Sequence, residues 1–332
     1  MRLRRKKSAV ILDRRYRKSM AVTRTTLLGG PAAILWRGHT LFAQDGILVT
    51  PALELAVVDS AAQGVIDATA SHAPVTIQFS PTTPFADLLA LYPFLDGALG
   101  TSLFGAVDTP LVLIAANGVR LTFAAAAIVQ MPDLTLSSSG VAAGAVTFVA
   151  LGARALPVTV ANRVVTIDTA DFPAASTPPQ LADDFEITWG AAPWLKLQAL
   201  DGVKVKFVMK SRPVWSAAHA LVDMTLESLT VTAQFTPGSP GSLAEADALQ
   251  ALQLAGVETL PGRLLSAGAR TLDIAGEHLW VRLPFAQVAE GPLVYDATKP
   301  RLGELVFTSV RAAMGAEADA IALAGLSEGE PG

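Results

Sequence analysis

The segment Val75-Thr76-Ile77-Gln78-Phe79-Ser80-Pro81 returns later in the chain as Val231-Thr232-Ala233-Gln234-Phe235-Thr236-Pro237. The two segments lie 156 residues apart (235 − 79), and Asp45-Gly46 matches Asp201-Gly202 at the same spacing. Self-similarity at a fixed long spacing is the signature of a structural unit that is used more than once. The sequence therefore predicts two copies of one domain in tandem.

Both repeated segments alternate apolar and polar residues, which is typical of a strand with one buried face. Other strand patterns lie at residues 35–49 around the Asp45-Gly46 turn, 64–79, 111–123 around Asn117-Gly118, 134–136, 145–151, 203–207, 225–235, 279–283 and 305–310. Helical spacing follows at residues 85–95 and 243–254. We predict a mainly β protein with two tandem duplicated β-sandwich or partial-barrel domains, each with one flanking α-helix.

The chain of 332 residues is long enough for two domains of ordinary size. We predict a basic arm at residues 1–20, a first domain at 21–153, a connector at 154–182, a second domain at 183–313 and an acidic, flexible end at 314–332. The connector is expected to contain one strand at residues 164–167. Proline, serine and threonine gather in the connector around residues 173–179.

Charge is distributed unevenly along the chain. Residues 1–20 contain nine Lys and Arg and one Asp, which leaves 16 basic residues (25 − 9) and 28 acidic residues (29 − 1) in the body. The basic arm is either a tail that binds nucleic acid or an acidic partner, or a mis-assigned extension before Met20. The acidic body is expected to repel phosphate backbones.

No constellation of reactive side chains is recognisable. The four histidines are isolated, and neighbouring carboxylates such as Asp183 and Asp184 point to opposite faces of a strand. The chain has no cysteine, and no apolar run is long enough to cross a membrane. We expect no catalytic residue, no cofactor and no metal.

The five tryptophans raise the alternative of sugar binding. Four of them lie in the second copy, and none matches another at the repeat spacing. We therefore expect the tryptophans to pack in the core or at an interface rather than to bind a ligand.

These features together resemble phage tail tube proteins of the long-tailed, non-contractile type, over about residues 21–313. The resemblance rests on the segment from Gly30 to Phe42 before an Asp-Gly pair, the strand that ends at Pro81, the helix after it, and the late segments 115–123 and 144–148. It implies β-sandwich subunits with a flanking helix, which stack as rings around a channel. Members with two fused domains form trimeric rings with pseudo-sixfold symmetry, and the duplication would match that group.

A tail tube implies a homo-oligomer in the virion, assembled in the host cytoplasm. Its partners would be the tape measure protein and other tail proteins, with DNA passing through the lumen without specific binding and with no membrane contact. Our candidates for the lumen are Thr76, Gln78, Thr232 and Gln234, on the polar faces of the repeated strands. The repeat-equivalent structural residues are Asp45, Gly46, Phe79, Pro81, Asp201, Gly202, Phe235 and Pro237.

Three alternatives remain open from the sequence. The first is another tail ring component, namely a terminator, distal tail or baseplate hub protein. The second is a two-domain β-sandwich module that binds carbohydrate. An enzyme is the remotest class, because the two copies share only turn and packing residues.

Overall fold

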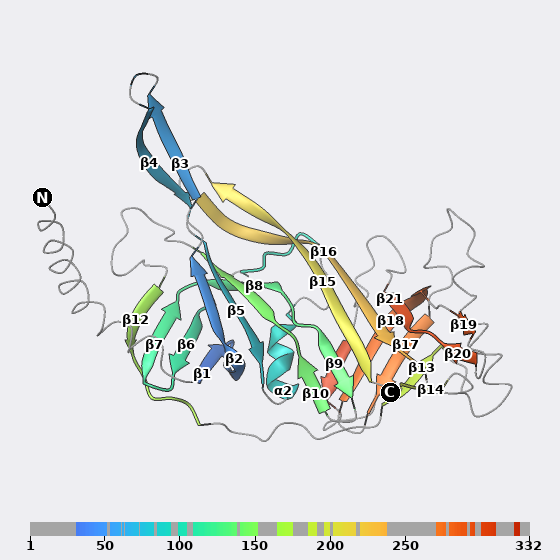
Figure 1. The fold of residues 1–332 in the computed structure, drawn as a ribbon. Helices are drawn as coiled ribbons and strands as arrows, with labels where there is room; N and C mark the ends of the chain where they lie inside the picture. The colour runs from blue at the N-terminus through green and yellow to red at the C-terminus, as the bar shows by residue number, and fades with distance from the viewer. Residues whose placement is uncertain are drawn as a thin grey trace, which may run out of the picture.

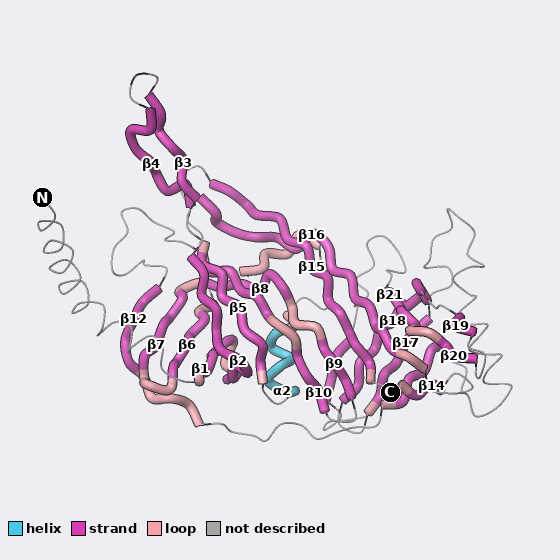
Figure 2. Tube along the Cα trace, in the orientation of Figure 1, coloured by secondary structure: helices cyan, strands magenta, loops and turns pink. Residues whose placement is uncertain are grey.

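The computed structural model describes residues 31–51, 54–60, 62, 64–72, 74–82, 85–93, 99–104, 109–137, 140–151, 165–174, 185–190, 196–199, 202–216, 220–237, 270–276, 279–290, 293–295, 300–309 and 322–325. These residues form an almost entirely β structure (Figure 2). The predicted mainly β class is confirmed. The basic arm at residues 1–20, Asp201 and the helix expected at residues 243–254 lie outside the described residues.

The first half of the molecule contains an eight-stranded antiparallel sheet in the order β12-β7-β6-β1-β2-β5-β11-β8 (Figure 1). Its strands are β1 (Ala32–Trp36), β2 (His39–Pro51), β5 (Val75–Pro81), β6 (Leu111–Ala115), β7 (Val119–Phe123), β8 (Ala126–Gln130), β11 (Val146–Ala150) and β12 (Val165–Thr169). A long hairpin of β3 (Glu54–Ser60) and β4 (Gly64–His72) extends from it.

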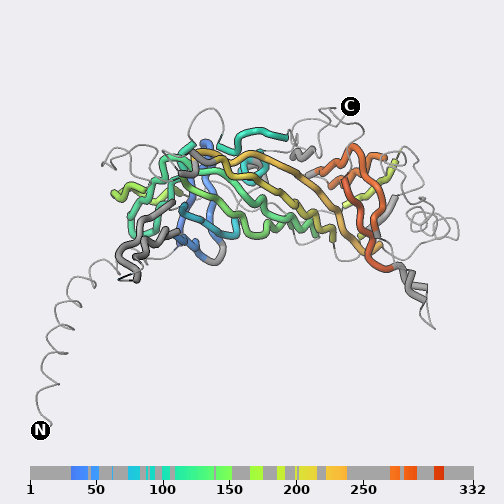
Figure 3. The backbone as a smooth tube through the Cα atoms, turned by 90° about the horizontal axis from the view of Figure 1, so that it is seen from above, coloured from blue at the N-terminus to red at the C-terminus, as the bar shows by residue number. Residues whose placement is uncertain are grey.

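The second half contains a ten-stranded sheet in the order β10-β9-β15-β16-β21-β18-β17-β13-β14, with β22 paired to β18. Its strands are β9 (Leu134–Ser137), β10 (Gly140–Ala143), β13 (Glu186–Trp189), β14 (Lys196–Gln198), β15 (Val203–Ser216), β16 (Ala220–Phe235), β17 (Arg270–Ala275), β18 (Leu279–Glu290), β21 (Leu305–Ser309) and β22 (Ala322–Gly325). A separate hairpin joins β19 (Leu293–Tyr295) and β20 (Pro300–Leu302). Viewed from above, the two halves follow one another along the long direction of the molecule (Figure 3).

An aromatic triad fills the core of each half. In the first half, Trp36 meets the ring of Phe148 edge-on with centroids 4.9 Å apart, and Phe148 stacks on Phe79 at 6.0 Å. In the second half, Trp189 meets Phe307 edge-on at 5.8 Å, and Phe307 stacks on Phe235 at 5.8 Å. Trp36 and Trp189 therefore occupy matching places, although they lie 153 residues apart (189 − 36) rather than at the 156-residue spacing.

Strand pairing in the second half repeats that in the first. Leu48 lies opposite Gln78 where β2 pairs with β5, and the residues 156 positions later, Lys204 and Gln234, lie opposite each other where β15 pairs with β16. Every described pair between β3 and β4 also has its counterpart, 156 positions later, between β15 and β16. Phe148 opposite Ile77 becomes Phe307 opposite Ala233.

The irregularities of the ladders repeat as well. One extra residue, Val129, interrupts the pairing of β8 with β11, and Ala289 interrupts the pairing of β18 with β21 at the matching position. Two irregularities between β3 and β4 return between β15 and β16, again at the same offset. β-Bulges are specific features of a fold, so their repetition goes beyond general similarity between two sheets.

The turn expected at Asp45-Gly46 is wrong. The strands reverse at Arg37 and Gly38, both with positive φ (47° and 84°), as a two-residue hairpin turn requires. Asp45 and Gly46 lie inside β2, where the pairing register with β5 shifts between Ala43 and Ile47. The glycine supplies a φ of 107° at this irregularity rather than at a chain reversal.

Two further expectations change. The helix expected at residues 85–95 is helical only at α2 (Phe85–Leu88) and η1 (Leu89–Leu91) in the described part of the chain. The acidic end at residues 314–332, expected to be flexible, contains β22, which pairs with β18. The expected turn at Asn117-Gly118 is confirmed, because β6 and β7 flank it and Gly118 has a φ of 82°.

Candidate interaction surfaces

The joint between the halves is a continuation of one β-sheet. Strand β9 leaves the first half and pairs with the edge of β15, with Leu136 opposite Val203 and Leu134 opposite Val205. These four side chains are fully buried. The sequence predicted β9 as a strand of the first domain, but it belongs to the sheet of the second half.

Close backbone contact accompanies this joint. A Cβ atom on Gly202 would lie 2.2 Å from the carbonyl oxygen of Leu136, so only glycine allows β9 to approach at this position. The φ of Gly202 is also positive, at 88°. Gly46, its repeat equivalent, has a φ of 107° but nothing within 4 Å of such a Cβ.

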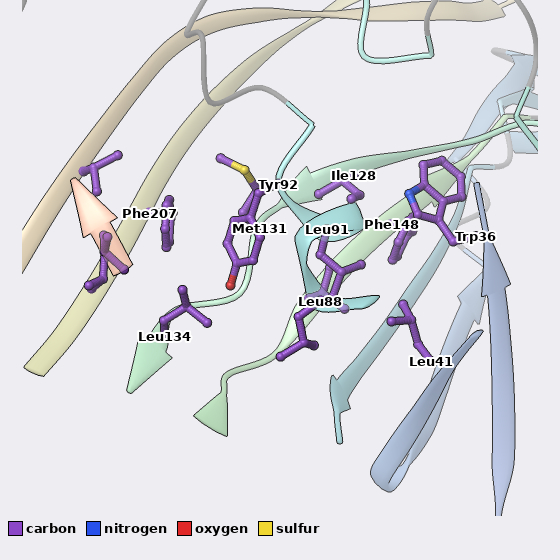
Figure 4. Packing of buried hydrophobic residues seen from close by; sticks show 14 of the residues in the cluster. Trp36, Leu41, Leu88, Leu91, Tyr92, Ile128, Met131, Leu134, Phe148 and Phe207 are labelled. Atoms are coloured by element: carbon purple, nitrogen blue, oxygen red, sulfur yellow. The ribbon is translucent and has the colours of Figure 1, made fainter. Parts of the chain in front are cut away.

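Tyr92 strengthens the joint from the helical segment of the first half. Its ring packs against Phe207 of β15 with centroids 4.8 Å apart (Figure 4). Its hydroxyl donates a hydrogen bond of 2.9 Å to the carbonyl oxygen of Pro132. Burial, followed by the negative charge of Asp133, raises the pKa of the Tyr92 hydroxyl well above its usual range. The neutral phenol is therefore the form that fits the joint.

Replacing Tyr92 with phenylalanine is expected to alter both neutral and alkaline stability. At neutral pH the variant should lose about 1 kcal/mol of unfolding free energy, because Pro132 keeps a buried acceptor without its donor. Because the folded pKa is raised, the stabilisation from the neutral phenol is complete below the unfolded pKa of about 10 and is lost as pH rises above it. Urea unfolding at pH about 7 and about 10.5 should show a gap between wild type and Tyr92→Phe that narrows at the higher pH. A constant gap would contradict this.

A loop adds a second contact across the joint. Residues 99–104 run beside the outer part of β16, where the amide of Gly100 donates to the carbonyl of Leu226 at 2.8 Å and the amide of Leu103 donates to that of Met224 at 2.7 Å. The Ser102 hydroxyl donates to Asp223 at 2.8 Å. The first half thus extends two edges of the second half, at β15 and at β16.

The matching edge in the first half carries no strand among the described residues. Residues Ile47, Leu48 and Val49 of β2 pair with β5 on one side only. Ile47 and Val49 are half-buried, whereas their counterparts Val203 and Val205 are fully buried beneath β9. The apolar side chain of Leu48 is 61% exposed.

The four lumen candidates lie on corresponding faces of the two sheets. Thr76 and Gln78 alternate with buried residues on β5, and Thr232 and Gln234 do so on β16. Strand pairing places Thr76 opposite Thr50 and Thr232 opposite Lys206. The repeat-equivalent residues Phe79, Phe235, Pro81 and Pro237 are buried.

This polar face does not carry the acidic excess of the chain. The paired segments 47–51, 75–81, 134–137, 146–150, 203–210, 228–235 and 305–309 contain no Asp or Glu. On β15, Lys204 and Lys206 lie opposite Gln234 and Thr232, and Lys210 follows. These segments of the face that holds the four lumen candidates therefore contribute no acidic side chain, and the repelling lumen stays a prediction.

Other kinds of site receive no support from the described residues. Within them, no group of three His, Cys, Asp or Glu side chains is placed to hold a metal ion. Nor does any helix among them have the length and apolar character needed to cross a membrane. No protein-family profile matches the chain, and no curated protein matches it.

Proposed function

We propose that the chain is a structural subunit of a phage tail tube, with two copies of one β-sandwich domain that take successive places in a ring. The observation that carries the proposal is the joint at β9 and β15, because it connects two similarly paired halves edge to edge. Repeated edge-to-edge addition of one unit produces a ring or a filament rather than a closed pair. Three chains would supply six such places, as the resemblance to fused tail tube proteins implies.

Repetition of pairing supports the duplication itself. The residue pairs between β1 and β2 match those between β13 and β14. The residue pairs between β12 and β7 match those between β22 and β18. Two sheets of unrelated origin would have no reason to share both register and bulge positions. The second half therefore presents to its surroundings the same kinds of edges as the first.

The proposed lumen is the polar face with Thr76, Gln78, Thr232 and Gln234. Its first-half part is uncharged along residues 47–51 of β2 and along β5, and its second-half part includes Lys204 and Lys206. Lysines on this face would attract phosphates, and such attraction weakens steeply with salt. We therefore propose a conduit whose contact with DNA is electrostatic and independent of sequence.

Electron microscopy of the purified full chain tests this function. Over a rising concentration series, we expect rings of uniform diameter and then stacked tubes, with light scattering giving multiples of one ring mass. Rings that never stack would favour a terminator, distal tail or hub protein. Monomers at every concentration, or monomers that bind glycans on an array, would contradict a tail ring function.

A further inference from the structure

We propose that β19 of one copy of the chain pairs with the free edge of β2 in a second copy. The expected register is Tyr295 opposite Ile47, Val294 opposite Leu48 and Leu293 opposite Val49. This inference rests on the proposed ring assembly and specifies which edges form its contact between chains. The partner is therefore a second copy of the same chain, bound head to tail.

The joint inside the chain provides the template. There, β9 is the outer strand, and it covers β15 with Leu136 opposite Val203 and Thr135 opposite Lys204. Its other side pairs with β10, with Leu134 opposite Ala143. The β9–β10 hairpin thus serves as the connecting piece between the halves.

The second half contains an equivalent hairpin. Leu293 opposite Leu302 on β19 and β20 matches Leu134 opposite Ala143, because both residues are shifted by 159 positions (293 − 134 and 302 − 143). The pair Tyr295 and Pro300 matches Leu136 and Val141 at the same shift. β19 therefore holds the place in the second half that β9 holds in the first. Within the described residues, β19 pairs with β20 alone.

The receiving edge is equally well defined. Ile47, Leu48 and Val49 match Val203, Lys204 and Val205, since β2 and β5 share their register with β15 and β16 at a shift of 156 residues (204 − 48). The register proposed for β19 and β2 follows from the observed β9–β15 pairs when 159 is added to each β9 residue number and 156 is subtracted from each β15 residue number.

Exposure indicates that no described residue of the same chain covers this edge. Pro51 is exposed, whereas its counterpart Phe207 is buried against Tyr92. The edge segment 47–51 has no charged residue, and Leu48 projects an exposed apolar side chain. Unpaired apolar edge strands readily accept another strand, and soluble proteins normally protect them with charge or proline. The proline here lies at the end of β2, beyond the three residues proposed to pair.

The same chain does not supply both partners. β19 and β20 lie at the far end of the second half, while β2 lies within the first half, well separated in Figure 1. A donor edge and a different acceptor edge make a heterologous contact, which propagates from copy to copy until a ring closes. The edge that β9 uses on β15 and the edge proposed for β2 would then alternate around the ring.

Disulfide crosslinking tests the register, and the chain favours this method because it has no cysteine. We expect a full-length chain with Leu48→Cys and Val294→Cys to form reducible covalent oligomers on mild oxidation, because directly opposite residues lie within disulfide range. A mixture of the two single variants should form covalent dimers and nothing larger. The double variant Thr135→Cys and Lys204→Cys, at the template joint, should lose its two free thiols by crosslinking within one chain and should form no covalent oligomer.

The matched control combines Leu48→Cys with Arg301→Cys. Arg301 lies opposite Val294 on β20 and would be one strand farther from β2, beyond disulfide range. Crosslinking of this control equal to that of the test pair would overturn the register.

The outcomes also separate this inference from the proposed function. Wild-type rings or tubes without a covalent product from Leu48→Cys and Val294→Cys would overturn the β19–β2 contact alone, provided that the template pair crosslinks. Crosslinked oligomers that never build tubes would support the contact and contradict the tail tube. Monomers without crosslinks would overturn both.

Discussion

Replacing Phe148 with alanine is expected to lower the free energy of unfolding by about 3–5 kcal/mol. Phe148 is fully buried between Trp36, which meets it edge-on, and Phe79, which stacks on it. Truncation removes both aromatic contacts and leaves a cavity that strands of a continuous sheet are poorly able to close. Chemical denaturation followed by tryptophan fluorescence should show this loss.

The equivalent change in the second half should have a similar effect. Phe307 is also fully buried and contacts Trp189 and Phe235 in the same arrangement. We expect Phe307→Ala to cost about 3–5 kcal/mol as well. Val149→Ala is the control, because Val149 follows Phe148 on β11 but lies on the partly exposed face, where losses of about 0.5 kcal/mol are usual. Equal losses in Phe148→Ala and Val149→Ala would contradict the importance of the triad.

Local sequence patterns predicted much of the fold because their causes are local. Alternation of apolar and polar residues from Leu229 to Phe235 placed one face of β16 inside, and the structure confirms buried Val231, Ala233 and Phe235. Asn117-Gly118 also predicted a real turn, since glycine there adopts a positive φ between adjacent strands.

Asp45-Gly46 shows why the same kind of signal failed elsewhere. The pair correctly marks a backbone position with positive φ, but such a position serves either a turn or an irregularity inside a strand. The real turn uses Arg37, whose positive φ is uncommon for a residue with a long side chain. Only the pairing of β1 with β2, and of β2 with β5, distinguishes the two roles.

The candidate surface depended on long-range information. The sequence predicted a strand at residues 134–136. Its pairing partner, residues 203–205, lies beyond the expected connector, and no local sequence pattern indicates which strand it pairs with. Trp36 and Trp189 likewise became equivalent only through matching contacts, because loop-length differences change the spacing between the halves. The lumen candidates were predicted as a polar face from alternation, whereas the neighbouring lysines of β15 became part of that face only through pairing.

The two equivalent glycines offer the sharpest comparison of a covered edge with a free one. Gly202→Ala is expected to destabilise the chain by roughly 3 kcal/mol or more. The positive φ costs a residue with a side chain about 1–2 kcal/mol. In addition, the new Cβ would lie 2.2 Å from the carbonyl oxygen of Leu136 and would displace β9. Gly46→Ala should incur only the backbone cost of about 1–2 kcal/mol, because nothing lies within 4 Å.

In the assembled state we expect Gly46→Ala to have a second effect, on ring formation. If β19 of a second copy covers β2 as β9 covers β15, the Cβ at position 46 would meet the incoming backbone, as the one at position 202 meets Leu136. Gly46→Ala should then remain folded by circular dichroism yet fail to form rings under conditions in which wild type does. Gly202→Ala should lose stability in urea unfolding even at dilutions where every chain is a monomer. Normal rings from Gly46→Ala would contradict the edge contact, while equal monomer stability of the two variants would show that the β9 joint does not need glycine.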